Sequence, residues 1–239
     1  MRNRRTSLAL FALLSLYGVQ SQAVQTEIVV GGSPTEIHQQ NGFPFSTLPI
    51  AYGHAGTRYQ QVYSSAQFPG AFDIRELVFY AAGRLDAPIL PANLEIHFST
   101  TPMGVNEIDF RPFDSNLGAD DHLFASLTGG FSLSGSELAI GGNPYLYDPM
   151  LGNLLLDIRV TGAAAGHSGP FFAALAAGDF APGATGPFSR WHDFGIGYDN
   201  SGLVTGFRTW VPEPGTLALL GLGLVGLGLS RPRRVQAPR

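Results

Sequence analysis

The sequence contains neither cysteine nor lysine. Without cysteine the chain can form no disulfide bond, even in an oxidising compartment, and it offers neither a thiol nucleophile nor a zinc–thiolate site. The six histidines are dispersed and show neither the HExxH pattern nor another paired spacing of metal ligands. Redox chemistry at cysteine, cysteine-nucleophile catalysis and thiolate-bound zinc are therefore excluded, and all fourteen basic residues are arginines.

The arginines are unevenly distributed along the chain. Residues 24–211 hold only seven of them against seventeen acidic residues, so this part carries a formal net charge of about −10. So acidic a body is a poor candidate for binding nucleic acid, and we expect no nucleic-acid partner. It should also be repelled by anionic membrane surfaces and attract cations weakly.

The N-terminal segment Met1–Ala23 has the layout of a secretory signal peptide. Three arginines among the first five residues precede an apolar run over 8–19, and Ser21-Gln22-Ala23 supplies small residues at −3 and −1. We expect export and cleavage after Ala23. The alternative is an N-terminal anchor that is not cleaved.

The tail, residues 211–239, ends in an apolar segment followed by Arg231, Arg233 and Arg234. As a helix, the run from Thr216 to Leu229 spans roughly 21 Å, whereas a bilayer core measures about 30 Å. Its glycines weaken the helix further, and snorkelling arginines or a thinner bilayer must close the gap. We therefore predict a short transmembrane helix over 215–229 and a cytoplasmic basic tail over 230–239, with the body on the opposite side of the membrane. A buried core helix is the alternative, against which the arginines and the terminal position argue.

The tail resembles the PEP-CTERM sorting signal in three successive parts: Val211-Pro212-Glu213-Pro214, the Gly/Leu-rich segment and the Arg-Pro-Arg-Arg end. These signals occur on exported proteins of Gram-negative bacteria that make extracellular polysaccharide. The resemblance implies a precursor anchored in the inner membrane and processed by exosortase, a membrane-embedded cysteine protease. The final location is then the cell surface or the extracellular space.

Pro212 and Pro214 also restrict the backbone on both sides of Glu213. Proline fixes φ and disfavours helix at the preceding residue, so Glu213 should lie in an extended segment that a protease can reach. The alternative is an ordinary proline linker in front of a tail anchor.

The body, residues 24–210, is long enough for one domain with a sizeable core. Gly, Pro, Ser and Thr recur at short intervals and no long amphipathic charged run interrupts them, which is typical of short strands joined by turns. We predict an all-β fold, an antiparallel β-sandwich of about eight to ten strands with jelly-roll topology.

Two segments show period-2 alternation most clearly. Leu94, Ile96 and Phe98 alternate with polar residues, which predicts a half-buried strand. In the run 154–161, Leu154, Leu156, Ile158 and Val160 occupy alternate positions, which makes it the clearest strand of the sequence. Other strands are expected at 28–30, 58–68, 73–81, 123–127, 131–133, 188–198 and 203–210, while 171–177 fits either a helical turn or a strand. The segments 58–68, 145–158 and 202–210 resemble an uncharacterised group of PEP-CTERM proteins with β-sandwich bodies, which implies no activity.

A weak calcium candidate lies at Asp114, Asn116, Asp120 and Asp121. These residues place oxygen ligands at intervals that loosely resemble the start of a calcium loop, but the spacing and the closing glutamate of an EF-hand are missing. A polar turn whose side chains bind their own backbone is the alternative. We expect no other cofactor.

Aromatic side chains beside acidic residues mark further positions. Tyr145 and Tyr147 precede Asp148-Pro149, Trp191 precedes His192-Asp193, and Trp210 closes the body. Aromatic residues in loops can stack on sugars, although a packed turn or a tryptophan in the core explains them too.

Two patterns that suggest catalysis are weak. Glu95 and His97 share the polar side of one strand, for which we expect a solvated sheet face, and nothing nearby supplies a nucleophile. Ser168 in Gly-His-Ser-Gly lacks the second glycine and the α/β context of a nucleophile elbow. We therefore expect no enzyme.

Three hypotheses follow for the body. It is a non-enzymatic surface or matrix protein, a module that binds the cell's own exopolysaccharide, or a glycan-active enzyme. An enzyme would have paired carboxylates facing one cleft, roughly 5–10 Å apart. A binding module would show exposed, coplanar aromatic side chains, and the structural role needs neither.

Overall fold

The computed structural model describes residues 24–34, 39–45, 56–83, 85, 93–108, 112–129, 133–162, 169–175, 186–192 and 201–211. The predicted signal peptide and the predicted transmembrane helix lie outside these residues. Within them, no helix is both long enough and apolar enough to cross a bilayer. The chain divides into two compact units, and the sandwich described below belongs to Thr26–Thr209; the other unit is Met1–Gln25 with Trp210–Arg239.

The described elements are almost all strands, which confirms the all-β prediction. They are β1 Val24–Val30, β2 Gln39–Asn41, β3 Gly56–Tyr63, β4 Phe72–Gly83, β5 Asn93–Thr101, β6 His122–Leu127, β7 Glu137–Tyr147, β8 Asn153–Thr161, β9 Phe171–Leu175, β10 Phe188–His192, β11 Gly202–Leu203 and β12 Thr205–Val211, with short 3₁₀ turns η2 Ser65–Gln67 and η3 Phe113–Asn116.

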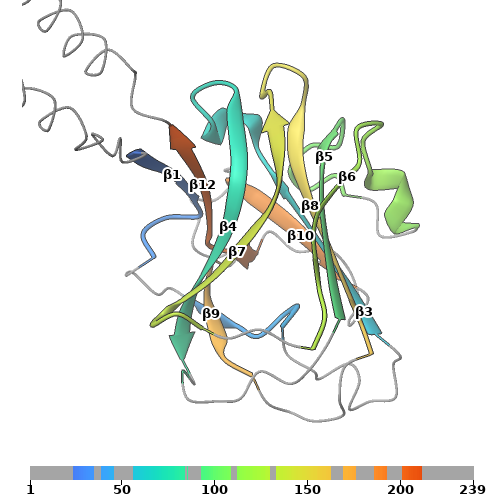
Figure 1. Ribbon diagram of the computed structural model, residues 1–239. Helices are drawn as coiled ribbons and strands as arrows, with labels where there is room; N and C mark the ends of the chain where they lie inside the picture. The colour runs from blue at the N-terminus through green and yellow to red at the C-terminus, as the bar shows by residue number, and fades with distance from the viewer. Residues whose placement is uncertain are drawn as a thin grey trace, which may run out of the picture. The chain divides into compact units, whose positions relative to one another are not determined.

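The strands form two antiparallel sheets, as the sandwich prediction requires (Figure 1). One sheet has the order β1-β12-β4-β9-β11, with β7 paired to β4 and β2 to β9. The other has the order β10-β3-β8-β5-β6. Except for β5 and β6, neighbouring strands are not consecutive in sequence, and each sheet can bury one face against the other.

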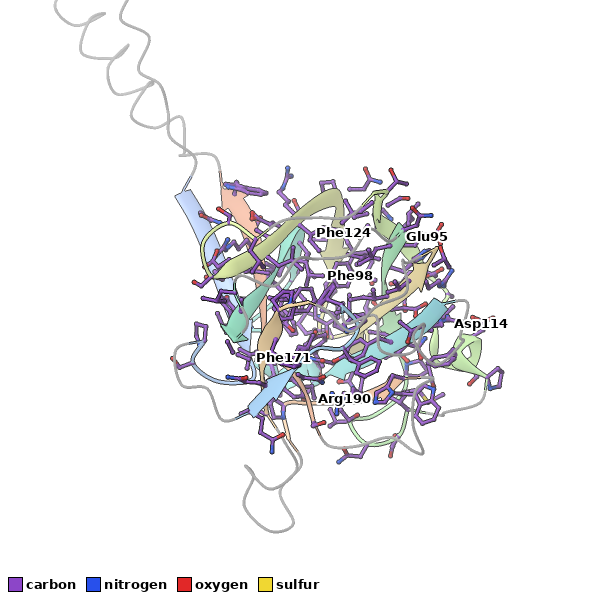
Figure 2. All side chains as sticks on the ribbon, turned by 90° about the horizontal axis from the view of Figure 1, so that it is seen from below. Glu95, Phe98, Asp114, Phe124, Phe171 and Arg190 are labelled. Atoms are coloured by element: carbon purple, nitrogen blue, oxygen red, sulfur yellow. The ribbon has the colours of Figure 1, made fainter. Side chains whose placement is uncertain are left out.

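An aromatic core fills the space between the sheets. Tyr63 packs edge-on against Phe207 with ring centroids 5.1 Å apart, and Phe98 packs likewise against Phe124 at 5.0 Å. Figure 2 shows Phe98 and Phe124 inside the body. Edge-to-face pairs add to the free energy of area burial, by about 0.5–1.5 kcal/mol each.

A second apolar cluster covers the outer face of the five-stranded sheet. Val62, Leu155, Ile108 and Trp191 are buried there, and Val105, Phe113 and Leu117 pack against them. The segment that follows β5 supplies Val105, Ile108, Phe113 and Leu117, so it lies on this sheet as an extra layer.

Both faces are buried in β8, and the prediction of a half-buried strand at β5 needs correction. In β8, Leu154, Leu156 and Ile158 do face the sandwich core, but Leu155 and Asp157 on the other side are buried as well. In β5 the same holds for His97, so the solvated face predicted for it was wrong, while Glu95 is exposed. Alternation in sequence reports what one sheet face buries, and it does not show whether a loop covers the other.

The structure also differs from the predicted strands at β6, β7 and β9. In β6 the register against β5 shifts between Ile96 and His97, which turns Phe124 into the core and leaves Leu123 42% exposed. β7 was not predicted, and Tyr145 and Tyr147 lie on this strand rather than in a loop. The ambiguous segment 171–177 contains the strand β9.

Candidate functional site

The last described strand leads directly into the predicted sorting segment. β12 ends at Val211, and Pro212 follows without an intervening linker. Ala23, Pro212, Glu213, Pro214, Arg231, Arg233 and Arg234 lie outside the described residues, so their roles stay predictions. In sequence, the body therefore ends where the motif begins.

Arg208 fixes β12 to three other strands. Its Nε donates to Glu27 of β1 at 2.9 Å, its Nη2 donates to Glu137 of β7 at 2.9 Å, and its Nη1 lies 3.5 Å from Glu76 of β4. The hydroxyl of Tyr80 also donates to Glu27, at 2.7 Å. Although burial alone would lower the pKa of Arg208, the hydrogen bond and charge of Glu137 and Glu27 raise it above its usual value.

A buried carboxylate, Asp157, organises the outer face of the five-stranded sheet. Arg58 binds it through two hydrogen bonds, Nε to Oδ1 at 2.8 Å and Nη2 to Oδ2 at 2.7 Å. Arg159 adds two more to Oδ2, at 3.0 and 2.9 Å. The Asp157 side chain is 1% exposed, so these charge-assisted bonds replace its hydration almost completely. Arg58 also lies 5.0 Å from the ring centre of Phe113.

The first two calcium candidates join this cluster through separate partners. Asp114 accepts a hydrogen bond from Nη1 of Arg58 at 2.7 Å, and this bond lowers the pKa of Asp114. Asn116 is fully buried, donates to the side chain of Gln60 at 2.9 Å, and accepts from Thr101 through its carbonyl oxygen. Its amide therefore ties the covering segment to β3.

The other two candidates bind elsewhere. Asp120 accepts from the backbone N–H of Thr100 and from the hydroxyl of Tyr145, both at 2.8 Å. Burial works against ionisation of Asp120, but these hydrogen bonds outweigh it, so its pKa lies below the usual value. Asp121 lies 3.2 Å from Nδ1 of His97, whose Nε2 is buried without a hydrogen-bond partner in the described part.

These partners leave the four candidate residues divided between different contacts. Calcium would have to displace Arg58 from Asp114 and the Thr100 N–H from Asp120. Within the described residues there is also no group of three or more His, Cys, Asp or Glu arranged to hold a metal ion. The geometry is that of side chains that fasten a covering loop to a sheet.

The candidate aromatic residues are core residues, with one exception. Tyr145, Tyr147 and Trp191 are 6%, 0% and 6% exposed, and Trp191 packs beside Phe113 at 5.8 Å. Burial and the neighbouring Asp120 raise the pKa of Tyr145, so its hydroxyl stays protonated and donates to that carboxylate. Trp210 is 37% exposed. These three buried rings cannot form a platform for a sugar.

Comparison with known proteins locates the functional signal in the tail. Residues 211–234 match the family model of the PEP-CTERM protein-sorting motif. The chain carries a PEP-CTERM motif. No curated protein and no solved structure shows significant similarity to the chain.

The PEP-CTERM match supports the sorting prediction made from Pro212–Pro214 and the arginines that follow the apolar run. This motif implies an exported protein that exosortase processes and that reaches the cell surface. The β-sandwich is the body that the PEP-CTERM tail delivers.

The charged clusters around Asp157 and Arg208 were not predicted. A signal for the first was present, since Asp157 and Arg159 interrupt the most apolar strand of the sequence and a buried acid needs a cationic partner. The partner Arg58 lies 99 residues away, so only the strand register identifies it. For Arg208 the excess of acids over arginines in the body indicates that one arginine can bind several glutamates, but the sequence does not show which arginine does so.

Proposed function

We propose that this PEP-CTERM protein is a non-catalytic component of the cell surface or extracellular matrix, associated with exopolysaccharide. In this proposal the signal peptide is removed after Ala23, and the tail holds the precursor in the inner membrane for a limited time. Exosortase then cuts near Pro212–Pro214. The observation that carries the proposal is the match of residues 211–234 to the sorting motif.

The composition of the tail supports a temporary anchor. The apolar segment is short for a bilayer and rich in glycine, so it holds the chain less firmly than an ordinary transmembrane helix would. The arginines at 231, 233 and 234 orient it with its basic end in the cytoplasm. Glu213 between two prolines then lies on the exported side, where exosortase reaches it.

The contacts in the body support a structural rather than a catalytic role. Asp157, Asp114 and Asp120 are bound by arginines, a backbone N–H or a tyrosine hydroxyl, which leaves them poorly suited to proton transfer. A general acid or base must reach the substrate and change its protonation state near the working pH. Carboxylates held in such networks instead join the layers of the body.

We further propose the jelly-roll topology for the body. Its eight strands would be β1, β12, β4 and β7 in one sheet and β3, β8, β5 and β6 in the other, in these orders. Among these eight strands the chain changes sheet at every step except β5–β6, as expected for two Greek keys in a double-sheet fold. The strands β2, β9, β10 and β11 then extend this framework.

A fractionation blot in a host that carries exosortase tests the sorting proposal. The double variant Pro212→Ala, Glu213→Ala should insert normally but accumulate unprocessed in the inner membrane, because the apolar segment and the arginines are unchanged. Neutralising Arg231, Arg233 and Arg234 should instead loosen orientation and retention. If the double alanine variant is processed and released like the unaltered chain, the tail is an ordinary anchor.

A glycan array tests the association with exopolysaccharide. The processed protein would be screened with and without calcium against the host's own polysaccharide and unrelated glycans. Specific binding that depends on calcium would support the hypothesis of a calcium site at Asp114–Asp121. If the protein binds no glycan, only the structural role remains.

A further inference from the structure

The end of β7 and the turn that connects it to β8 in the other sheet present large apolar side chains to solvent. Leu146, Met150 and Leu151 are 70%, 88% and 74% exposed, which makes them the three most exposed large hydrophobic residues in the described part of the chain. We call these three side chains the apolar tip. Soluble proteins seldom gather such residues on one protrusion unless it meets an apolar partner.

Hydrogen bonds hold the turn that carries Met150 and Leu151 of the apolar tip. Asp148 accepts hydrogen bonds from the backbone N–H of Met150 at 2.9 Å and, through its carbonyl oxygen, from that of Leu151 at 3.0 Å. The hydroxyl of the buried Tyr147 donates to the carbonyl oxygen of Gly152 at 2.7 Å and closes the base of the turn. The exposed side chains are therefore held outward by a rigid support, which lowers the entropy lost when they bind.

The apolar tip lies at the end of the seven-stranded sheet toward which the C-terminal strand runs. Phe72, the first residue of β4, pairs with Tyr147 just before the turn. β12 runs antiparallel to β4, from Thr205 beside Phe79 to Arg208 beside Glu76, and so proceeds toward the Phe72 end. Figure 1 shows the β7–β8 connection at the end of this sheet where β4 begins.

The chain leaves little distance between that strand and the anchor. Five residue steps separate Val211 from Thr216, where the apolar segment begins. Fully extended, they span at most about 18 Å. A precursor held by its tail must therefore keep the end of β12 close to the bilayer.

We propose that the apolar tip inserts into the outer leaflet of the membrane that holds the anchor. This inference rests on the proposed function, because it needs the tail to be inserted. Leucine and methionine suit a hydrocarbon environment, and the turn places no arginine there that would select a phospholipid headgroup. Since the body is acidic, the contact should be stronger on zwitterionic than on anionic lipid.

The tail and the apolar tip would attach the protein to the membrane with different strength, which also explains how the processed protein is released. While the tail is inserted, it raises the effective concentration of the apolar tip at the bilayer, so even a weak contact is populated. Once the tail is cut, a few side chains must hold the protein alone, and even a whole myristoyl chain gives only marginal binding. Processing therefore converts an oriented precursor into a protein that dissociates.

Single labelled cysteines test this contact in the full-length chain, which has no native cysteine. Met150→Cys reports on the tip, Leu85→Cys is an exposed control beyond the opposite end of β4, and Leu220→Cys reports on the tail. Each variant carries an environment-sensitive fluorophore and is reconstituted into phosphatidylcholine vesicles whose acyl chains bear nitroxide quenchers. Position 150 should be quenched several-fold more than position 85, and position 220 most strongly.

The outcomes separate this inference from the proposed function. Quenching at 220 but not at 150 overturns the contact of the tip and leaves the anchor intact, whereas no quenching at 220 overturns both. A label at 150 that is shielded from a water-soluble quencher but not quenched by lipid shows that a second copy of the chain covers the tip, and also overturns lipid insertion.

A second pair of variants removes the apolar side chains. Met150→Ser with Leu151→Ser should lower the partitioning of the processed protein to phosphatidylcholine vesicles at least tenfold, because two exposed apolar side chains lose their transfer free energy. Leu85→Ser is the matched control and should change nothing. Equal partitioning of the double variant and the unaltered protein would contradict the proposal.

Discussion

Replacing Arg58 by methionine should destabilise the body strongly while keeping most of the packing of the side chain. Among the described contacts, Oδ1 of Asp157 receives its hydrogen bond from Arg58 alone, and Arg159 binds only Oδ2. Arg58→Met therefore leaves a buried carboxylate with half of its partners. Breaking a buried ion pair from one side costs about 3–5 kcal/mol, and the remaining Arg159 favours the lower end of that range. For a body of this size, about 3 kcal/mol lowers Tm by roughly 6–12 °C.

Urea unfolding of the body, residues 24–211, measures this loss against a matched control. Arg75→Met removes the same side chain from a surface pair with Asp73, in which both partners are at least one-third exposed, so it should cost less than about 1 kcal/mol. Adding Asp157→Leu to Arg58→Met should recover much of the stability, because no unpaired charge then stays buried. If Arg58→Met lowers the free energy of unfolding no more than Arg75→Met does, the ion pairs of Asp157 do not stabilise the outer face of the five-stranded sheet as argued.

Three further outcomes follow from the fold. The body expressed alone should show a β-type far-UV circular dichroism spectrum, and Ile158→Asp should abolish it by burying an unpaired charge; a mainly helical spectrum would refute the fold. The pKa of Asp120 is lowered in the folded state, so its contribution to stability should be present above about pH 4 and disappear at lower pH, and Asp120→Asn should flatten that decline in pH-dependent unfolding. Gly118→Ala should cost about 2 kcal/mol or more because its methyl group would meet the carbonyl oxygen of Thr100, whereas Gly70→Ala, with open space around it, should change stability by less than about 1 kcal/mol.

The features that sequence predicted are those encoded over a few consecutive residues. Leu154, Leu156 and Ile158 alternate because one face of β8 lies on the core, and that period is visible without knowing what β8 pairs with. The sorting tail is likewise contiguous, so the order of motif, apolar segment and arginines could be recognised directly.

The features that sequence did not predict depend on contacts between distant segments. The layer on the outer face of the five-stranded sheet comes from an irregular segment in which Ile108 and Phe113 follow no period. Phe124 enters the core through a local shift in strand pairing, which hydrophobic alternation cannot anticipate. The calcium candidates resembled a loop of ligands because Asp114 and Asp120 are close in sequence, whereas folding gives each a different partner.

Intact mass spectrometry of the protein recovered outside the inner membrane tests the central claim most directly. The protein would be isolated from a host with exosortase and from the same host without it. With exosortase we expect a mass that begins at Val24 and ends within 211–215, and without it the product should retain the tail to Arg239 and stay in the membrane fraction. A released product that still ends at Arg239 in the host with exosortase would contradict the sorting function assigned to this chain.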